Sequence, residues 1–441
     1  MRSSPARRAP LLVAVTLLGA TALGPALPAA AAAPTPKATP GAARPTAKPT
    51  PGMGAPTPCA TDVQYLVNGK ASTVRSLPAP VSRVGGAELA AGGLHVTTAA
   101  TTPPPAPKAT AWLVADLGTG QVLAACNAHV PLAPASSLKV LTALALAPRV
   151  DVAVQYTART EDASVDGTRV GLVPGSLYTG DNLWHALLMS SANDAAVALG
   201  QLAGGLPAAT DAMRRTAQAL GAADTVPYNT SGLDLPGQVS SAYDLALFGR
   251  AALAVPQLAA IMRTRAYAFP EEGTAPPGTR GPDGKPVRAT FQIQNHDKLL
   301  YNYPGALGVK NGWTSTTGGS FVAAAQRGDR RLVATVLAAD PETWHMSAAL
   351  LDWAFTATPA GAPGLGRLVD GPDPDGALPG TSAAAASGAA ARAEVAPRPR
   401  GTTSAGPSFP PVVVAAAGGG AVLLLVGGIV STRGSRRRVR R

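Results

Sequence analysis

The chain has 441 residues, a formal net charge of +12, and 48 glycines and 43 prolines. Much of the glycine, proline and alanine lies outside the middle of the chain, so we expect one folded domain of about 250 residues. Three arginines precede the first apolar run, six follow the last one, and neither stretch contains an acidic residue. Without these nine arginines, the rest of the chain has a formal net charge of only +3. This excludes a nucleic-acid-binding protein, which would carry its charge on the folded domain.

Residues 1–33 are typical of a signal peptide for export. A basic start leads into the apolar run LLVAVTLLGATAL and then into small residues. An amino-terminal membrane anchor is the alternative, but this apolar run is short for a span. Residues 34–105 are expected to form a Pro/Ala-rich linker and a short extension, because 34–58 contain almost no large apolar side chains. Apolar pieces such as VQYLV could add a strand or two to the extension.

The middle of the chain predicts strands at both ends and helices between them. AWLVAD and QVLAAC predict a hairpin around the turn LGTG. Helices are predicted from Pro134, as a pair over DNLWHALLMSSANDAAVALGQLAGG, over residues 208–220, and after Ser241 as N-cap. A second hairpin turns at Gly328-Asp329, and HMSAALLDWAFTA predicts a closing helix. This order predicts a sheet built from both ends of the domain around an inserted helical region.

The carboxyl-terminal part predicts a tether to a membrane. Residues 359–409 return to an Ala/Gly/Pro composition and are expected to be a flexible spacer. Residues 410–431 contain an uncharged apolar run long enough to cross a hydrocarbon core. The alternative is a buried glycine-rich helix. The basic tail 432–441 favours a cytoplasmic carboxyl terminus, so we expect a single-pass membrane protein whose folded domain lies outside the cytoplasm.

The two cysteines, Cys59 and Cys126, could form one disulfide in an exported protein. Two unpaired thiols are the alternative. Neither cysteine lies in a metal-ligand pattern, and the chain has no Walker loop or dinucleotide fingerprint. We therefore expect no metal and no cofactor.

Three short motifs carry the chemistry: Ser136-Ser137-Leu138-Lys139, Ser191-Ala192-Asn193 and Lys310-Asn311-Gly312. Each alone could be an ordinary helix start, a helix–helix turn or an Asn-Gly turn. In this order, S-x-x-K, S-x-N and K-x-G form the three-part signature of the serine penicillin-recognising hydrolases. The combination therefore predicts a serine acyl-transfer enzyme.

Each residue type in these motifs suits one step of acyl transfer. A serine nucleophile needs an adjacent base, and Lys139 lies one helical turn after Ser136 on the same face. A desolvated lysine beside a second cation has a lowered pKa and can accept a proton. The Ser191 hydroxyl could relay a proton to the leaving amine, and Asn193 could hold Lys139 and donate to a substrate carbonyl. Lys310 would add positive charge to the site.

Four segments carry a more specific resemblance: PASSLK, SSAND, TSGLDLPGQVSSAYDLAL and GALGVKNGWTSTTGGSFVAAA. With them the chain resembles the low-molecular-mass penicillin-binding proteins, specifically the D-alanyl-D-alanine carboxypeptidases, in their membrane-anchored actinobacterial-type form. The resemblance implies an α/β fold of the β-lactamase/transpeptidase-like type, with an antiparallel sheet flanked by helices plus an inserted helical lobe. It assigns residues 106–358 to a serine DD-peptidase catalytic domain.

The resemblance also implies roles for the site residues. Ser136 would attack the D-Ala-D-Ala bond of peptidoglycan stem peptides, with Lys139 as general base and Ser191 as proton relay. Asn193 would bind the acyl-side amide, and Lys310, Asn311 and Gly312 would line the carboxylate site. The backbone amides of Ser136 and Trp313 would form the oxyanion hole, and β-lactam antibiotics would acylate the same serine.

Two positions depart from the family pattern. The family usually has threonine where Asn311 stands, and some relatives have histidine where Trp313 stands. An asparagine amide can still donate to a carboxylate, so we expect binding to be retained. The alternatives are a β-lactamase-like hydrolase, for which no convincing deacylating glutamate lies between Asn193 and Lys310, and a non-catalytic penicillin-fold cell-wall binding protein.

Overall fold

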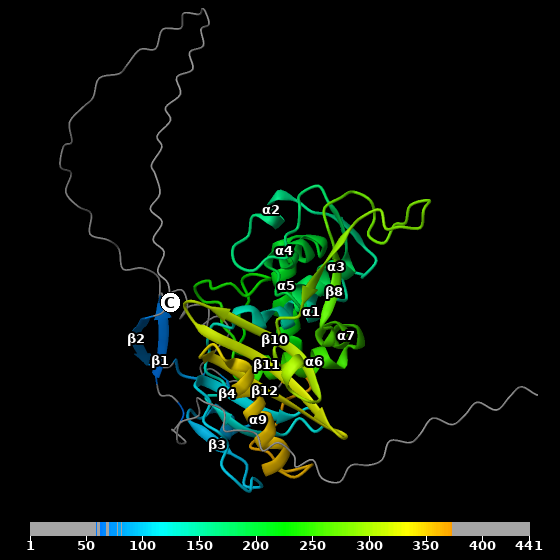
Figure 1. The fold of residues 1–441 in the computed structure, drawn as a ribbon. Coiled ribbons are helices and arrows are strands. Elements are labelled where there is room, and N and C mark those ends of the chain that lie inside the picture. Colours follow the sequence, from blue (N-terminus) through cyan, green and yellow to red (C-terminus); the bar gives the residue numbers. More distant parts are fainter. Residues whose placement is uncertain (1–58, 60–61, 68–69, 77, 81, 373–441) are drawn as a thin grey trace, which may run out of the picture. The chain divides into compact units, whose positions relative to one another are not determined.

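The structure is a computed structural model that describes residues 59, 62–67, 70–76, 78–80 and 82–372 (Figure 1). The chain divides into two units, Met1–Asp234 with Gln238–Ala377, and Leu235–Gly237 with Leu378–Arg441. Only the short loop Leu235–Gly237 of the second unit is described. The predicted signal peptide, membrane span and basic tail, with most of the linker and spacer, lie outside the described residues.

A six-stranded antiparallel sheet forms the centre of the first unit, in the order β10-β11-β12-β4-β5-β3. Its strands are β3 (Leu94–Val96), β4 (Ala109–Asp116), β5 (Val122–Cys126), β10 (Ala306–Thr314), β11 (Gly318–Arg327) and β12 (Arg330–Ala339). The first and last strands of the domain meet where β4 pairs with β12. The predicted sheet built from both ends is therefore confirmed, and so are the hairpins β4–β5 and β11–β12.

Helices cover both faces of this sheet, which is why almost every residue of β4 is buried. Trp112 and Val114 point to one face, against the closing helix α9 (Thr343–Ala357). Leu113 and Ala115 point to the other face, where α6 (Ala242–Ala254) packs. This period of two places two hydrophobic clusters on opposite sides of one strand.

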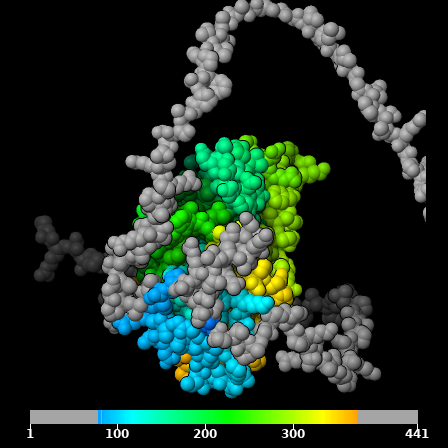
Figure 2. Space-filling view, turned by 90° about the vertical axis from the view of Figure 1, so that its left-hand side faces the viewer, coloured from blue at the N-terminus to red at the C-terminus, as the bar shows by residue number. Residues whose placement is uncertain are grey.

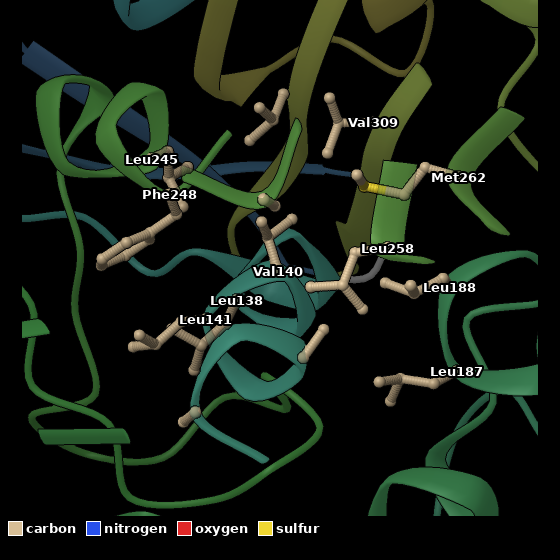
Figure 3. Close-up of a cluster of buried hydrophobic side chains, with 14 of the residues drawn as sticks. Leu138, Val140, Leu141, Leu187, Leu188, Leu245, Phe248, Leu258, Met262 and Val309 are labelled. Atoms are coloured by element: carbon tan, nitrogen blue, oxygen red, sulfur yellow. The ribbon is translucent and has the colours of Figure 1, made fainter. Parts of the chain in front are cut away.

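The helical lobe gathers around α1 (Lys139–Leu146), which follows the single 3₁₀ turn η2 (Ala135–Leu138). Figure 3 shows Val140 and Leu141 of α1 among side chains from α3, α6, α7 and β10. The other helices of the lobe are α3 (Gly180–Leu188), α4 (Asn193–Leu202), α5 (Leu206–Ala219) and α7 (Pro256–Arg263), with the short α2 (Thr160–Ala163). The short α8 (Leu299–Asn302) packs against β10 and α9 instead. In Figure 2 the green surface of this lobe lies above the blue surface of the residues that carry β3.

Three small hairpins lie outside the main sheet: β1 (Asp62–Val67) with β2 (Lys70–Ser76), β6 (Gln155–Thr157) with β7 (Leu177–Thr179), and β8 (Ala266–Pro270) with β9 (Thr290–Gln294). The sequence suggests a strand only for the first of these hairpins. Within the described residues, no single helix is long and apolar enough to cross a membrane. The bent pair α6 and α7, at 103°, passes by length and composition only.

The folded unit extends beyond both boundaries expected from sequence, 106 and 358. On the amino-terminal side, β3 pairs with β5 and so belongs to the sheet. On the carboxyl-terminal side, the amide of Leu365 donates to Val122, whose own amide donates to Gly366. Leu368 is fully buried. Residues 363–370, hereafter the carboxyl-terminal strap, are thus part of the packed domain and not of a free spacer.

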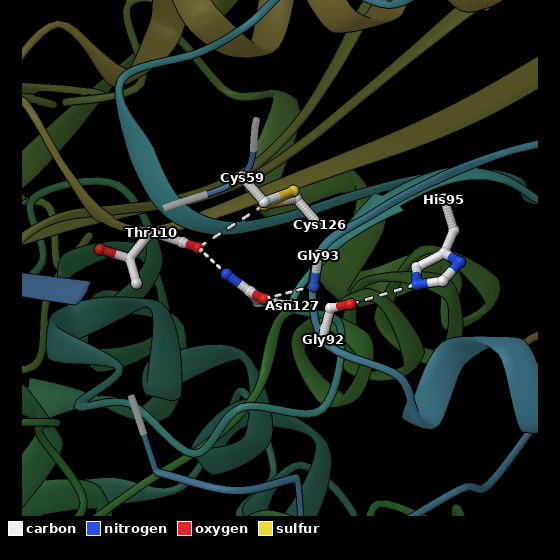
Figure 4. The surroundings of a disulfide bond; sticks show 7 residues. All are labelled: Cys59, Gly92, Gly93, His95, Thr110, Cys126 and Asn127. Carbon is white, nitrogen blue, oxygen red and sulfur yellow. Dashed lines mark hydrogen bonds between the residues drawn. A yellow bond between two sulfur atoms is a disulfide. The ribbon is translucent and has the colours of Figure 1, made fainter. Parts of the chain in front are cut away.

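A disulfide joins Cys59 to Cys126, with their Cα atoms 5.7 Å apart (Figure 4). Cys126 is the last residue of β5, and the next residue, Asn127, donates to the carbonyl of Thr110 at 2.8 Å. The pairing that the sequence left open therefore attaches the amino-terminal extension to the central sheet.

Candidate active site

The nucleophile position is set by the turn that precedes α1. Ala135 has a positive φ of 48°, a conformation that L-residues adopt rarely. Ser137 is fully buried and donates to the carbonyl of Pro134 at 2.6 Å. Ser136 is partly exposed and turns its hydroxyl toward Lys139. Of the two adjacent serines, only Ser136 therefore faces the site.

Lys139 is fully buried and makes three hydrogen bonds through Nζ. It donates to Ser136 Oγ at 2.9 Å, to Asn193 Oδ1 at 2.7 Å and to the carbonyl of Ser231 at 2.5 Å. Burial lowers the pKa of Lys139 well below its usual value, and the charge of Lys310 lowers it further. Asp194 acts in the opposite direction. A lysine with a depressed pKa, in contact with a serine hydroxyl, is equipped to accept its proton.

Ser191 and Asn193 come from the tight connection between α3 and α4. Ser191 has a φ of 60°, and its hydroxyl makes no hydrogen bond with any described residue. Asn193 begins α4 and uses both ends of its amide: Oδ1 accepts from Lys139, and Nδ2 donates to the carbonyl of Asp166 at 2.7 Å. Asn193 therefore fixes the lysine and a surface loop at the same time.

Lys310, Asn311 and Gly312 lie on the edge strand β10, beside the turn η2. Lys310 is 1% exposed, and burial lowers its pKa to about 7 against the opposing charge of Asp297. Its Nζ donates to the Asn311 carbonyl at 2.5 Å. A Cβ at Gly312 would lie 2.6 Å from the Ser136 amide nitrogen, so only glycine permits this approach. Trp313 follows with a side chain that is 55% exposed.

The structure adds a loop for which the sequence suggested no role. The Ser231 carbonyl is the third acceptor of Lys139, and it lies in the SGLD segment. Asn229 shapes this loop, because its Oδ1 accepts from the amides of Ser231 and Gly232. Gly232 has a φ of 80°, and a Cβ there would lie 2.0 Å from the Ala135 carbonyl. The match to the quoted TSGLD segment was the available signal for this contact.

Asp194 is the second residue that sequence reasoning missed. It is fully buried beside Asn193, and its carboxylate accepts from the backbone amides of residues 170–172. The same loop meets Asn193 through the Asp166 and Thr168 carbonyls. The S-x-N motif and the 166–172 loop therefore form one unit at the site.

The part of the chain that contains this site is similar in sequence to known proteins. Residues 97–341 match the model of the peptidase S11 family, described as D-alanyl-D-alanine carboxypeptidase. The chain is 37% identical over 276 residues to the D-alanyl-D-alanine carboxypeptidase DacB2 of Mycobacterium tuberculosis, covering 61% of this chain and 90% of that protein. It is 31% identical to DacC of Escherichia coli, covering 57% of this chain and 62% of that longer protein.

Solved structures give the same result. The D-alanyl-D-alanine carboxypeptidase of Mycobacterium tuberculosis superposes with a TM-score of 0.54 at 34% identity, over 64% of this chain and 98% of that one. Penicillin-binding protein 6B of Escherichia coli gives a TM-score of 0.51 at 28% identity, over 59% of this chain and 81% of that one. The α/β fold expected from the motifs is therefore confirmed, and the chain belongs to the peptidase S11 family of serine-type D-alanyl-D-alanine carboxypeptidases.

Proposed function

We propose that this chain removes the terminal D-alanine from peptidoglycan stem peptides through an acyl-enzyme on Ser136. The observation that carries the proposal is the 2.9 Å contact between Ser136 Oγ and the buried Nζ of Lys139. The burial of Lys139 and the positive charge of Lys310 both favour a neutral amine. A neutral amine has a lone pair with which to take the serine proton.

The acylation step follows from these positions. Ser136 Oγ attacks the carbonyl carbon of the penultimate D-alanine as Lys139 accepts the hydroxyl proton. The amides of Ser136 and Trp313 would stabilise the developing oxyanion, and Gly312, next to Trp313, approaches the Ser136 amide so closely that a Cβ there would lie 2.6 Å from its nitrogen. The C–N bond then breaks, and Ser191 relays a proton to the departing D-alanine amine.

Deacylation returns the site to its starting state. A water molecule attacks the ester on Ser136, the serine oxygen leaves and regains a proton, and the shortened peptide is released. Lys310 and Asn311 would hold the carboxylate of the terminal D-alanine during acylation. β-Lactam antibiotics carry a carboxylate and a strained amide, so they would acylate the same serine and act as covalent inhibitors.

The test is labelling with a fluorescent penicillin together with an assay of D-alanine release from a D-Ala-D-Ala peptide. Stable labelling with D-alanine release supports the proposal. Rapid loss of the label would indicate a β-lactamase, and absence of labelling would indicate a non-catalytic binding protein. Lys139→Ala should slow acylation by roughly 10²-fold or more if Lys139 is the base. A loss smaller than about tenfold would assign the proton to another group.

We propose further that the enzyme works outside the cytoplasm, as a single-pass membrane protein with a cytoplasmic carboxyl terminus. Support comes from the sequence of residues 1–33, 410–431 and 432–441. Protease added to intact cells should degrade the catalytic domain and spare the arginine-rich tail. Degradation of the tail alone would reverse the topology.

A further inference from the structure

The segment Asn295–Asp297 and the helix after it contact the elements that carry two of the three catalytic motifs, S-x-N and K-x-G. The Asn295 side chain donates to the carbonyls of Met262 and Thr264, which end α7. The His296 amide donates to the Met189 carbonyl at 2.9 Å, two residues before Ser191. α8, which follows the segment, packs against β10. The backbone of this segment is therefore fixed relative to both S-x-N and K-x-G.

Asp297 is the last residue of that segment and is 1% exposed. Its Oδ1 accepts from the Leu299 amide at 2.8 Å. Its Oδ2 is buried and has no hydrogen-bond partner among the described residues. An unpartnered buried carboxylate oxygen is costly unless a positive charge lies near it. The charge of Lys310, which is equally buried, acts on Asp297 through space and lowers its pKa, without a direct ion pair between the two side chains.

The charged groups around Lys310 leave this interaction without a competitor. The charge of Lys310 lowers the pKa of Lys139 on α1, which favours the neutral form of that amine. Burial, and then the charge of Lys310, lower the pKa of His296 and so favour its neutral form, and Arg263 at the end of α7 is exposed. Asp297 alone raises the pKa of Lys310, while its own pKa is raised by burial to about 7.

We propose that Asp297 is the buried counter-charge of Lys310 and acts as a positioning residue for the substrate carboxylate. This inference rests on the proposed function. With Asp297 ionised, Lys310 stays an ammonium although Lys139 beside it is neutral. The carboxylate of a stem peptide or a penicillin then meets a cation whose Nζ already lies within 3.4 Å of Asn311 Oδ1. The Asp297 carboxylate thus favours the charged form of Lys310 while Lys139 is neutral.

The experiment compares Asp297→Asn with the wild type on a D-Ala-D-Ala peptide and on its C-terminal methyl ester. Asparagine keeps an oxygen for the Leu299 amide and removes only the charge. We expect KM for the free acid to rise roughly tenfold, about 1.4 kcal/mol of binding, with kcat changed less. The preference for acid over ester should fall, and the alkaline limb of kcat/KM should move to lower pH. Asp352→Asn, a carboxylate on α9 paired with Arg327, is the matched control and should change none of these values.

An unchanged acid-to-ester preference together with an unchanged pH profile would overturn the inference. Activity and labelling of the wild type in the same series test the proposed function separately. If Asp297→Asn folds poorly, Lys310→Met with and without Asp297→Asn decides. In that background Asp297 is a buried charge without a partner, so its removal should raise the melting temperature. A further loss of stability there would also contradict the proposal.

Discussion

Two buried polar clusters occupy the same domain and differ in how their charges are arranged. The lysine cluster consists of Ser136, Lys139 and Lys310. The histidine cluster consists of His129, Asp224 and Asp244, all three fully buried. In the first, two buried lysines interact electrostatically and one hydroxyl reaches solvent. In the second, His129 Nδ1 lies 2.7 Å from Asp224 Oδ2, and no member reaches solvent.

The histidine cluster is a polar network closed to solvent, in which Asp224 Oδ1 and Asp244 Oδ1 have no hydrogen-bond partner among the described residues. His129 Nε2 lies 3.0 Å from the Val84 carbonyl, so both ring nitrogens face acceptors. Asp224 also accepts from Ser241 at 2.7 Å, and the Tyr243 ring covers the imidazole at 4.5 Å. The imidazole has an acceptor at each ring nitrogen and the cluster is sealed from solvent, which favours stability over reactivity. The lysine cluster combines two lysines of lowered pKa with one nucleophile open to solvent, an arrangement suited to proton transfer.

Ser136→Ala removes the reactive hydroxyl of the lysine cluster and should have the largest effect. Penicillin labelling and D-alanine release should fall to background while the melting temperature is retained, because Ser136 is the proposed nucleophile. The control is Ser137→Ala, whose hydroxyl is buried on Pro134 and should be dispensable for labelling. Labelling that disappears with Ser137 and persists without Ser136 would move the nucleophile by one residue.

His129→Ala disrupts the histidine cluster and should lower the stability of the fold instead of the activity. Asp224 would remain buried without its partner, at a cost of about 3 kcal/mol in the free energy of unfolding. His345→Ala, on the exposed face of α9, is the matched control and should stay within about 0.5 kcal/mol. Urea denaturation measures both. Loss of kcat/KM in folded His129→Ala would contradict the separation of the two clusters.

Truncation tests how much the carboxyl-terminal strap, which packs beside the histidine cluster, contributes to stability. The Tyr243 hydroxyl donates to the Arg367 carbonyl at 2.7 Å, so the carboxyl-terminal strap holds the ring that covers His129. A domain that ends at Ala357 loses the buried Leu368 and should unfold at least about 2 kcal/mol more easily than one that ends at Pro372. Equal denaturation midpoints would show that the strap adds nothing.

Asp244→Asn should change the dependence of stability on pH. Burial, and then the charge of Asp224, raise the pKa of Asp244, so the folded state holds its proton. Stability from that proton is present at low pH and is lost as the pH rises through the raised pKa. Asparagine has no such proton. Relative to the wild type, the variant should therefore gain up to about 1.4 kcal/mol per pH unit in this window, measured by denaturation from pH 5 to 9. A constant difference would exclude Asp244 as the titrating group.

The sequence predicted side chains better than backbone contacts. The spacing of Ser136 and Lys139 placed them on one face of a helix, and the structure brings them to 2.9 Å. The Ser231 carbonyl could not be found this way, because a backbone oxygen carries no residue signature and lies 92 positions away.

The carboxyl-terminal strap shows the limit of composition as a guide. Its glycines indicated a flexible spacer. A Cβ at Gly366 would lie 2.3 Å from the Gly85 carbonyl, so glycine there permits close packing. The strands β6 and β7 escaped prediction because three residues are too few for a periodic pattern. Sequence patterns therefore located the lysine cluster. They gave no sign of the histidine cluster, whose members are spread over 116 positions of the chain.

The smallest expected effect lies at Asn311, on the rim of the lysine cluster. Its Oδ1 faces Lys310 Nζ at 3.4 Å, and its Nδ2 has no hydrogen-bond partner among the described residues, which leaves a donor for a carboxylate. A threonine hydroxyl also donates, so Asn311→Thr should keep kcat/KM within about tenfold, or ~1.4 kcal/mol. Asn311→Ala should lose more, because the substrate carboxylate then lacks one partner in a partly dry site. D-alanine release by the three forms measures this order. If alanine performs as well as asparagine, the carboxylate depends on Lys310 alone, and the lysine cluster is defined by its two lysines and one serine.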